Sequence, residues 1–138
     1  MTGWFGSWNT QGGNEPTGIP DALQTVSGAG PITVLAGQSV HVTAFASINN
    51  SQMLSGPLYF LIVYFPADAG VGVLATPVGE EQEYGFTGDT PTFQIGSTAL
   101  IQNLPPGSYY VGLAARVPPG PLINMLAATA GAGMALVF

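Results

Sequence analysis

Glycine and proline break this chain into short segments along its whole length, and this spacing restricts the folds open to it. The 138 residues include 20 glycines and 12 prolines. Between them lie apolar stretches rich in β-branched and aromatic residues, which recur about every 8–12 residues and show almost no helical period. Because proline cannot donate to a β-ladder, prolines at the ends of these stretches are typical of strand termini. The spacing predicts about seven to nine short antiparallel strands.

Such a series of strands predicts an all-β protein, an antiparallel β-sandwich with either a jelly-roll or an immunoglobulin-like topology. The first thirty residues differ from the rest, since they are rich in glycine and show neither a strand nor a helical period. We therefore expect residues 1–30 to form an extended N-terminal arm and residues 31–138 to form the sandwich domain.

Two segments predict their strands with particular clarity. In residues 39–47, apolar and polar side chains alternate, which places Val40 and Val42 on one face and His41 and Phe45 on the other. Residues 58–65 are continuously apolar, which predicts a strand covered on both faces.

The remaining strands are predicted from weaker patterns. They are expected at residues 31–35, 72–76, 84–87, 92–95, 98–104, 108–117 and 134–138. An acidic loop is expected at residues 80–83. Before the last strand, the pattern favours either a turn at residues 131–133 between two strands or a short helix.

Two short segments resemble parts of immunoglobulin-like sandwiches. Residues 34–43 (VLAGQSVHVT) resemble their early strand pair, and residues 104–111 (LPPGSYYV) resemble the entry to a late strand. This resemblance implies that a tyrosine near the start of the late strand bonds back to the preceding loop. It implies a fold and no activity, because such sandwiches host many unrelated functions.

The whole chain also resembles viral coat and decoration proteins of the phage type. The shared features are a start without a signal peptide, an arm, a sandwich rich in glycine and proline, and few charges. This resemblance implies a virion component, located in the virion.

Scarcity of charge excludes several classes of partner and chemistry. Charged residues make up 6% of the chain, against about 25% in average soluble domains, and the formal net charge is −6. A single Arg and no Lys leave no basic surface for nucleic acid or an anionic membrane. Without cysteine there is no thiol nucleophile or zinc–thiolate site. We expect neither an enzyme nor a bound cofactor.

The ionisable residues allow one metal hypothesis. Glu80, Glu81, Glu83 and Asp89 could offer carboxylate oxygens to calcium, but they lack the spacing of a known calcium loop, and a solvated acidic loop is favoured. His41, the single histidine, cannot form a multi-histidine metal site, so a surface or interface histidine is expected.

Aromatic residues on the arm are the first candidates for contacts between subunits. Trp4, Phe5 and Trp8 offer large apolar surfaces of the kind that dominate interface energetics. They either cap their own sandwich or dock on a neighbouring subunit. Arg116 is expected to pair with an acid, within the domain or across a subunit contact.

The C-terminal segment supplies the other interface candidates, Met134 and Phe138. Residues 122–138 contain no charge, so insertion in a membrane is one alternative for this segment. Glycines within the segment and the lack of closely flanking basic residues favour strands instead.

These observations favour a structural assembly protein, a virion component of the decoration, minor-capsid or spike type. Its partners would be copies of itself or other structural subunits of the same particle, held through the arm and apolar surfaces. One alternative is a secreted carbohydrate- or ligand-binding module that makes weak glycan contacts through tyrosines. The other is an extracellular filament subunit joined by strand donation.

Overall fold

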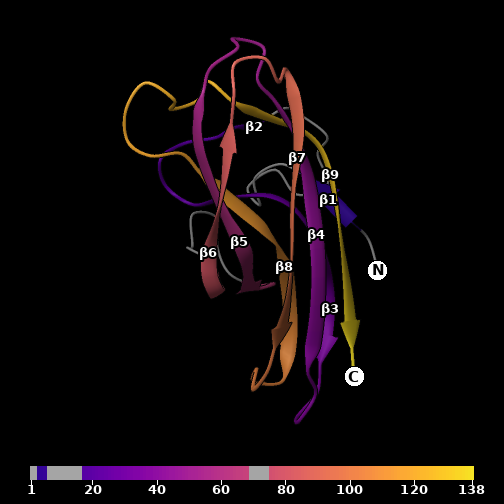
Figure 1. Ribbon diagram of the computed structural model, residues 1–138. Helices are drawn as coiled ribbons and strands as arrows, with labels where there is room; N and C mark the ends of the chain where they lie inside the picture. Colours follow the sequence, from indigo (N-terminus) through magenta and orange to yellow (C-terminus); the bar gives the residue numbers. More distant parts are fainter. Residues whose placement is uncertain (1–2, 6–16, 69–74) are drawn as a thin grey trace.

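A computed structural model describes residues 3–5, 17–68 and 75–138. Within them the chain forms two antiparallel sheets and no helix, which confirms the all-β sandwich (Figure 1). The strands are β1 (Gly3–Phe5), β2 (Thr17–Gly18), β3 (Gln24–Val34), β4 (Val40–Asn49), β5 (Gly56–Pro66), β6 (Thr76–Phe86), β7 (Thr92–Ile101), β8 (Gly107–Arg116) and β9 (Ala127–Val137).

The order of the strands identifies the topology as a jelly roll. One sheet has the order β1-β3-β8-β5-β6 and the other β2-β9-β4-β7. Four antiparallel pairs are nested in the sequence, so that the chain has the pairing of one long folded hairpin. They are β5 with β6, β4 with β7, β3 with β8 and β2 with β9. Pairing of β4 with β9 and of β5 with β8 rolls this hairpin into two sheets. Of the two topologies left open by the sequence, the chain adopts the eight-strand jelly roll, with β1 added at an edge.

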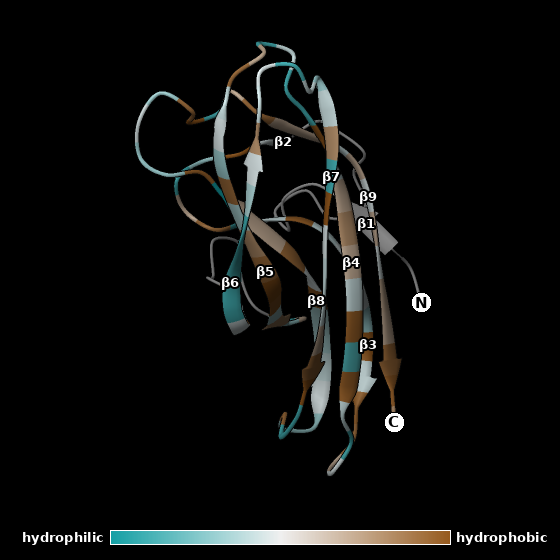
Figure 2. Cartoon of the chain, in the orientation of Figure 1, coloured by the Kyte–Doolittle hydropathy of each residue, from teal (hydrophilic) through white to brown (hydrophobic). Residues whose placement is uncertain are grey.

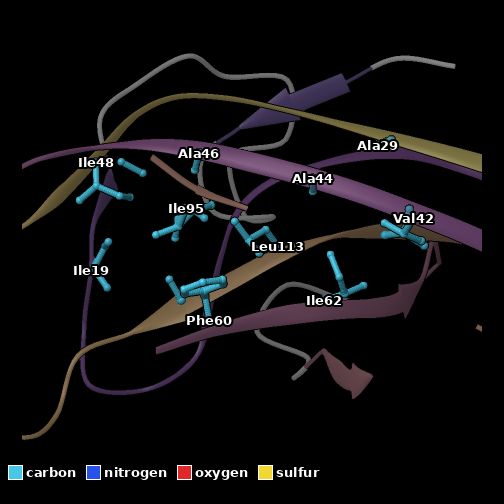
Figure 3. Packing of buried hydrophobic residues seen from close by; sticks show 14 of the residues in the cluster. Ile19, Ala29, Val42, Ala44, Ala46, Ile48, Phe60, Ile62, Ile95 and Leu113 are labelled. Carbon is cyan, nitrogen blue, oxygen red and sulfur yellow. The ribbon is translucent and has the colours of Figure 1, made fainter. Parts of the chain in front are cut away.

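The main core lies between the two sheets (Figure 3). Val42 and Ile48 of β4 face Phe60 and Ile62 of β5, and Leu113 of β8 lies among them. These side chains are at most 7% exposed. Burying each one contributes roughly 1.5–3 kcal/mol, so the inward positions of these strands hold the sandwich together.

Strand β5 is covered on both faces, as its unbroken apolar sequence predicts. Phe60 and Ile62 belong to the main core, whereas Leu61 and Val63 form a second cluster with Ala114 on the opposite side of the sheet. Leu23 and Ala75 pack against this second cluster. The outer face of the first sheet is therefore partly closed.

Three expectations about the weaker strands are wrong. Residues 80–83 lie within the continuous strand β6 rather than in a loop. Residues 92–101 form one strand, β7, because they pair with β4 along their whole length. Residues 131–133 make no turn but lie within β9, where they pair with Ala44, Phe45 and Ala46 of β4.

Strand β3 begins earlier than predicted. It runs from Gln24 to Val34 and so crosses residue 30, where the sequence predicts the end of the arm. Residues 25–30 are buried where β3 pairs with β8 and packs against β9 of the other sheet. Ile19, also within the predicted arm, is fully buried in the main core.

Candidate functional site

The outer face of the second sheet is the candidate functional site. Neighbouring strands place its side chains in three rows across β7, β4 and β9. The rows are Leu100, His41 and Leu136; Thr98, Thr43 and Met134; and Gly96, Phe45 and Ala132. These nine residues, with Phe138 directly after β9, are named the open face.

The open face carries large apolar side chains in water. Met134 is 68% exposed, Leu136 63% and Phe138 61%, while Leu100 and Phe45 are 47% and 43% exposed. None of the ten residues is an acid, a lysine or an arginine. Contiguous exposed apolar surface of this kind marks interaction sites in soluble proteins.

Strand alternation puts these residues on the outside. Along β4 each buried valine or alanine is followed by an outward side chain, so Val42 is buried while His41 and Thr43 are exposed. The hydropathy colours of β4 alternate in the same way, and the C-terminal end of β9 is hydrophobic (Figure 2). In β9, Ala135 points inward between Met134 and Leu136. Because side chains alternate between the two faces of a strand, the apolar residues at these outward positions are exposed rather than packed in the core.

Polar groups on the open face bond to one another. The Thr98 hydroxyl donates to the Val42 carbonyl at 2.9 Å and lies 3.0 Å from Nε2 of His41. The hydroxyls of Thr43 and Thr98 are 3.2 Å apart. Because these groups already have partners in the chain, covering the face with an apolar surface leaves few of them unsatisfied.

The structure places the predicted interface residues in different parts of the fold. Met134 and Phe138 lie on the open face. Trp4 and Phe5 belong to β1, which pairs with β3 of its own sandwich. Trp8 lies outside the described residues.

Arg116 lies on the outer side of the first sheet and pairs with Glu81 of the same chain. Its Nε donates to one carboxylate oxygen at 2.8 Å and a terminal nitrogen donates to the other at 2.7 Å. The guanidinium also lies 4.5 Å from the centre of the Tyr59 ring. Hydrogen bonding to Glu81 raises the pKa of Arg116 above its ordinary value. The predicted pairing of Arg116 with an acid is confirmed.

The acidic residues are not gathered into a metal site. Glu80, Glu81 and Glu83 lie within β6, and Asp89 lies in the turn before β7. Thr87 donates a hydrogen bond to the Asp89 carboxylate, which lowers the pKa of that group. In the part of the chain that the structure describes, no three histidine or acidic side chains are grouped as they would be around a metal ion.

Tyr109 makes the bond that the immunoglobulin-like resemblance implies. Its hydroxyl donates to the Pro105 carbonyl at 2.6 Å, and the residue is only 6% exposed. Burial raises the pKa of Tyr109, with smaller contributions from Tyr64 and Asp68. This tyrosine therefore stabilises the strand entry and is not available for stacking on a sugar.

Sequence reasoning missed part of the open face. The alternation in residues 39–47 correctly turns Phe45 and His41 away from the core, but Leu100 and Leu136 are not recognisable as their neighbours. The signal for Leu136 was the alternation of larger and smaller apolar side chains in residues 134–138, which the glycines before it obscured.

No helix among residues 3–5, 17–68 and 75–138 is long and apolar enough to cross a membrane. Comparisons with protein-family models, curated proteins and solved structures found no match to this chain.

Proposed function

We propose that this chain is a structural assembly protein, a virion component of the decoration, minor-capsid or spike type. It binds neighbouring subunits, either copies of itself or other structural proteins of the same particle. The open face is the observation that carries the proposal, since five large apolar side chains are exposed together on one uncharged sheet surface. Covering such a surface stabilises an assembly, whereas leaving it in water favours non-specific association.

The distribution of charge supports the same function. A freely diffusing domain keeps charge on its surface for solubility, yet only 6% of this chain is charged. Three of its acids lie within β6, an edge strand of the other sheet. A subunit whose neutral surface is covered by neighbours needs little charge there, because an unpaired buried charge is costly.

The native mass of the full chain tests this proposal. Light scattering should show a stable oligomer, or the chain should sediment with the particle it belongs to. Deleting residues 1–12 should weaken the assembly if the arm also binds a neighbour. A chain that stays monomeric at every concentration and binds no particle would contradict the proposed function.

A further inference from the structure

We infer that the open face is the contact between two copies of this chain, packed face to face about a two-fold axis. The axis runs along the strands, midway between β4 and β9. This inference rests on the proposed function and names the partner of the same surface. Four observations support it: the charge of the open face, the unsuitability of the β7 edge for pairing, the shape of the open face and its area.

Charge favours a face-to-face arrangement of two acidic copies. Each copy has a net charge of −6, so any approach that brings the acids together is repulsive. No described acid is among the ten residues of the open face, although Glu80 and Glu81 of β6 line a depression that includes Thr98 and Leu100 at its β7 border. Stacking the open faces separates the β6 glutamates of the two copies by about three sheet spacings, on the order of 30 Å. This distance exceeds the Debye length of about 8 Å at physiological salt, so the repulsion is screened.

The β7 edge of the second sheet is less suited to pairing two copies. Strand β7 ends the second sheet and carries no charge between Thr92 and Ile101. However, Glu80 and Glu81 of β6 line the same surface depression as residues 97–100 of β7. Pairing β7 with its own copy would bring these glutamates together, which costs energy and protects the edge.

The shape of the open face fits a copy of itself. Phe45 stands between two small residues, Gly96 and Ala132. A two-fold axis between β4 and β9 sets each β4 opposite the β9 of the other copy. Phe45 then faces Ala132 of the second copy, and Met134 faces its Thr43. Each contact occurs twice, as an isologous interface requires.

The available area matches a dimer of ordinary size. The exposed parts of the five large apolar side chains on the open face amount to roughly 560 Å², taking about 200 Å² for a whole side chain. A stable interface buries about 800 Å² on each partner. The remaining area is available from Thr43, Thr98, His41 and the outer positions further along β4 and β7.

Sedimentation equilibrium of the full chain with one charge substitution tests the inference. Met134→Lys places an ammonium group at the centre of the proposed contact, so the dimer should weaken by about 100-fold or more. Met53→Lys is the matched control, because Met53 is similarly exposed, at 60%, but lies in the loop after β4. The control should dimerise like the wild type.

The position of the two-fold axis is tested by mixing two variants. Thr43→Glu and Met134→Lys should each be monomeric alone, since each buries an unpaired charge. In an equimolar mixture, the glutamate of one copy faces the lysine of the other, so a mixed dimer should form. A mixture that stays monomeric would overturn the proposed register.

The outcomes separate this inference from the proposed function. An oligomer that survives both Met134→Lys and Leu136→Lys overturns the face-to-face contact and leaves an assembly protein that uses another surface. A wild-type chain that is monomeric but still binds a particle would likewise overturn the face-to-face contact and leave the proposed function standing. A monomer that binds nothing overturns both. Circular dichroism of each variant shows whether the fold is retained, which is expected because both side chains are more than 60% exposed.

Discussion

At the scale of single residues, Asn50 makes an unusually complete set of hydrogen bonds. It is fully buried, and its side-chain amide donates to the carbonyls of Leu54, Thr87 and Thr90 at 2.9–3.3 Å. Its carbonyl oxygen accepts from the Leu54 amide at 3.0 Å, and its own backbone amide donates to Pro91. Asn50 thereby ties the loop after β4 to the turn between β6 and β7.

Replacing Asn50 by alanine should destabilise the protein strongly. Asn50→Ala leaves several partly buried backbone groups of Leu54, Thr87 and Thr90 without this partner and empties a fully buried site, so the free energy of unfolding should fall by about 2–3 kcal/mol. Urea denaturation measures this change. Asn49→Ala, at the half-buried neighbour, should change stability by less than about 0.5 kcal/mol. Equal effects of the two substitutions would contradict the role of Asn50.

Tyr109 should contribute to stability through its hydroxyl. Tyr109→Phe removes the donor to Pro105 and should lower the free energy of unfolding by about 1 kcal/mol near neutral pH. The pKa of Tyr109 is raised above 10.0 in the folded chain, so its contribution is complete below pH 10 and is lost as the pH rises further. Wild-type stability should therefore fall more steeply than that of the variant in alkaline solution. Parallel curves would show that the hydroxyl is not the group responsible.

Arg116 should matter to the monomer and not to the contact between copies. Arg116→Lys keeps the charge but loses the two-bond geometry with Glu81, at a site only partly shielded from water. Unfolding free energy should fall by about 0.5–1 kcal/mol, with the native mass unchanged. Lost assembly with unchanged stability would instead place Arg116 in a subunit contact, the alternative that the sequence allows.

At the scale of elements, β9 and β3 approach each other closely across the two sheets. A Cβ atom on Gly133 would lie 2.4 Å from the carbonyl carbon of Gly28, and one on Gly131 would lie 2.8 Å from Cβ of Ser27. The two strands run side by side in Figure 1. Glycine in β9 is therefore required by contact with backbone rather than by a turn.

Adding one methyl group to β9 should disturb this contact. Gly133→Ala should lower the free energy of unfolding by about 2–4 kcal/mol, because the clash is with backbone that cannot rotate away. Gly85→Ala in β6 is the control, since no atom lies within 4 Å of its added Cβ. Thermal denaturation compares the two. A Gly133→Ala chain as stable as the control would show that β9 and β3 lie further apart.

The same glycines explain which elements could be predicted from the sequence. Strands β4, β5 and β8 have strong alternation or long apolar runs, and their positions agree with the prediction. In β9, Gly131 and Gly133 carry the pattern of a turn, and only the neighbouring β3 shows why they lie in a strand. In β6 the glutamates have the composition of a loop, because an edge strand tolerates charge facing water.

At the scale of the whole molecule, long-range pairing creates the open face. Met134 and Phe138 could be predicted as adhesive from their place in an uncharged terminal segment. Their grouping with Phe45 and Leu100 depends on β4 lying between β7 and β9, which brings together residues far apart in the chain. Neither composition nor local alternation specifies that strand order. The sequence therefore predicts individual residues of the open face but not their grouping into one surface.

The methyl signals of the methionines test the central claim most directly. The chain has four methionines, of which Met134 lies on the open face while Met53 and Met125 are exposed elsewhere. With the methyl groups labelled, NMR spectra of the full chain can be followed as its concentration rises. We predict that the Met134 signal shifts or broadens as copies associate, while those of Met53 and Met125 stay fixed. Association that moves the Met53 or Met125 signal and leaves Met134 unchanged would contradict assembly through the open face.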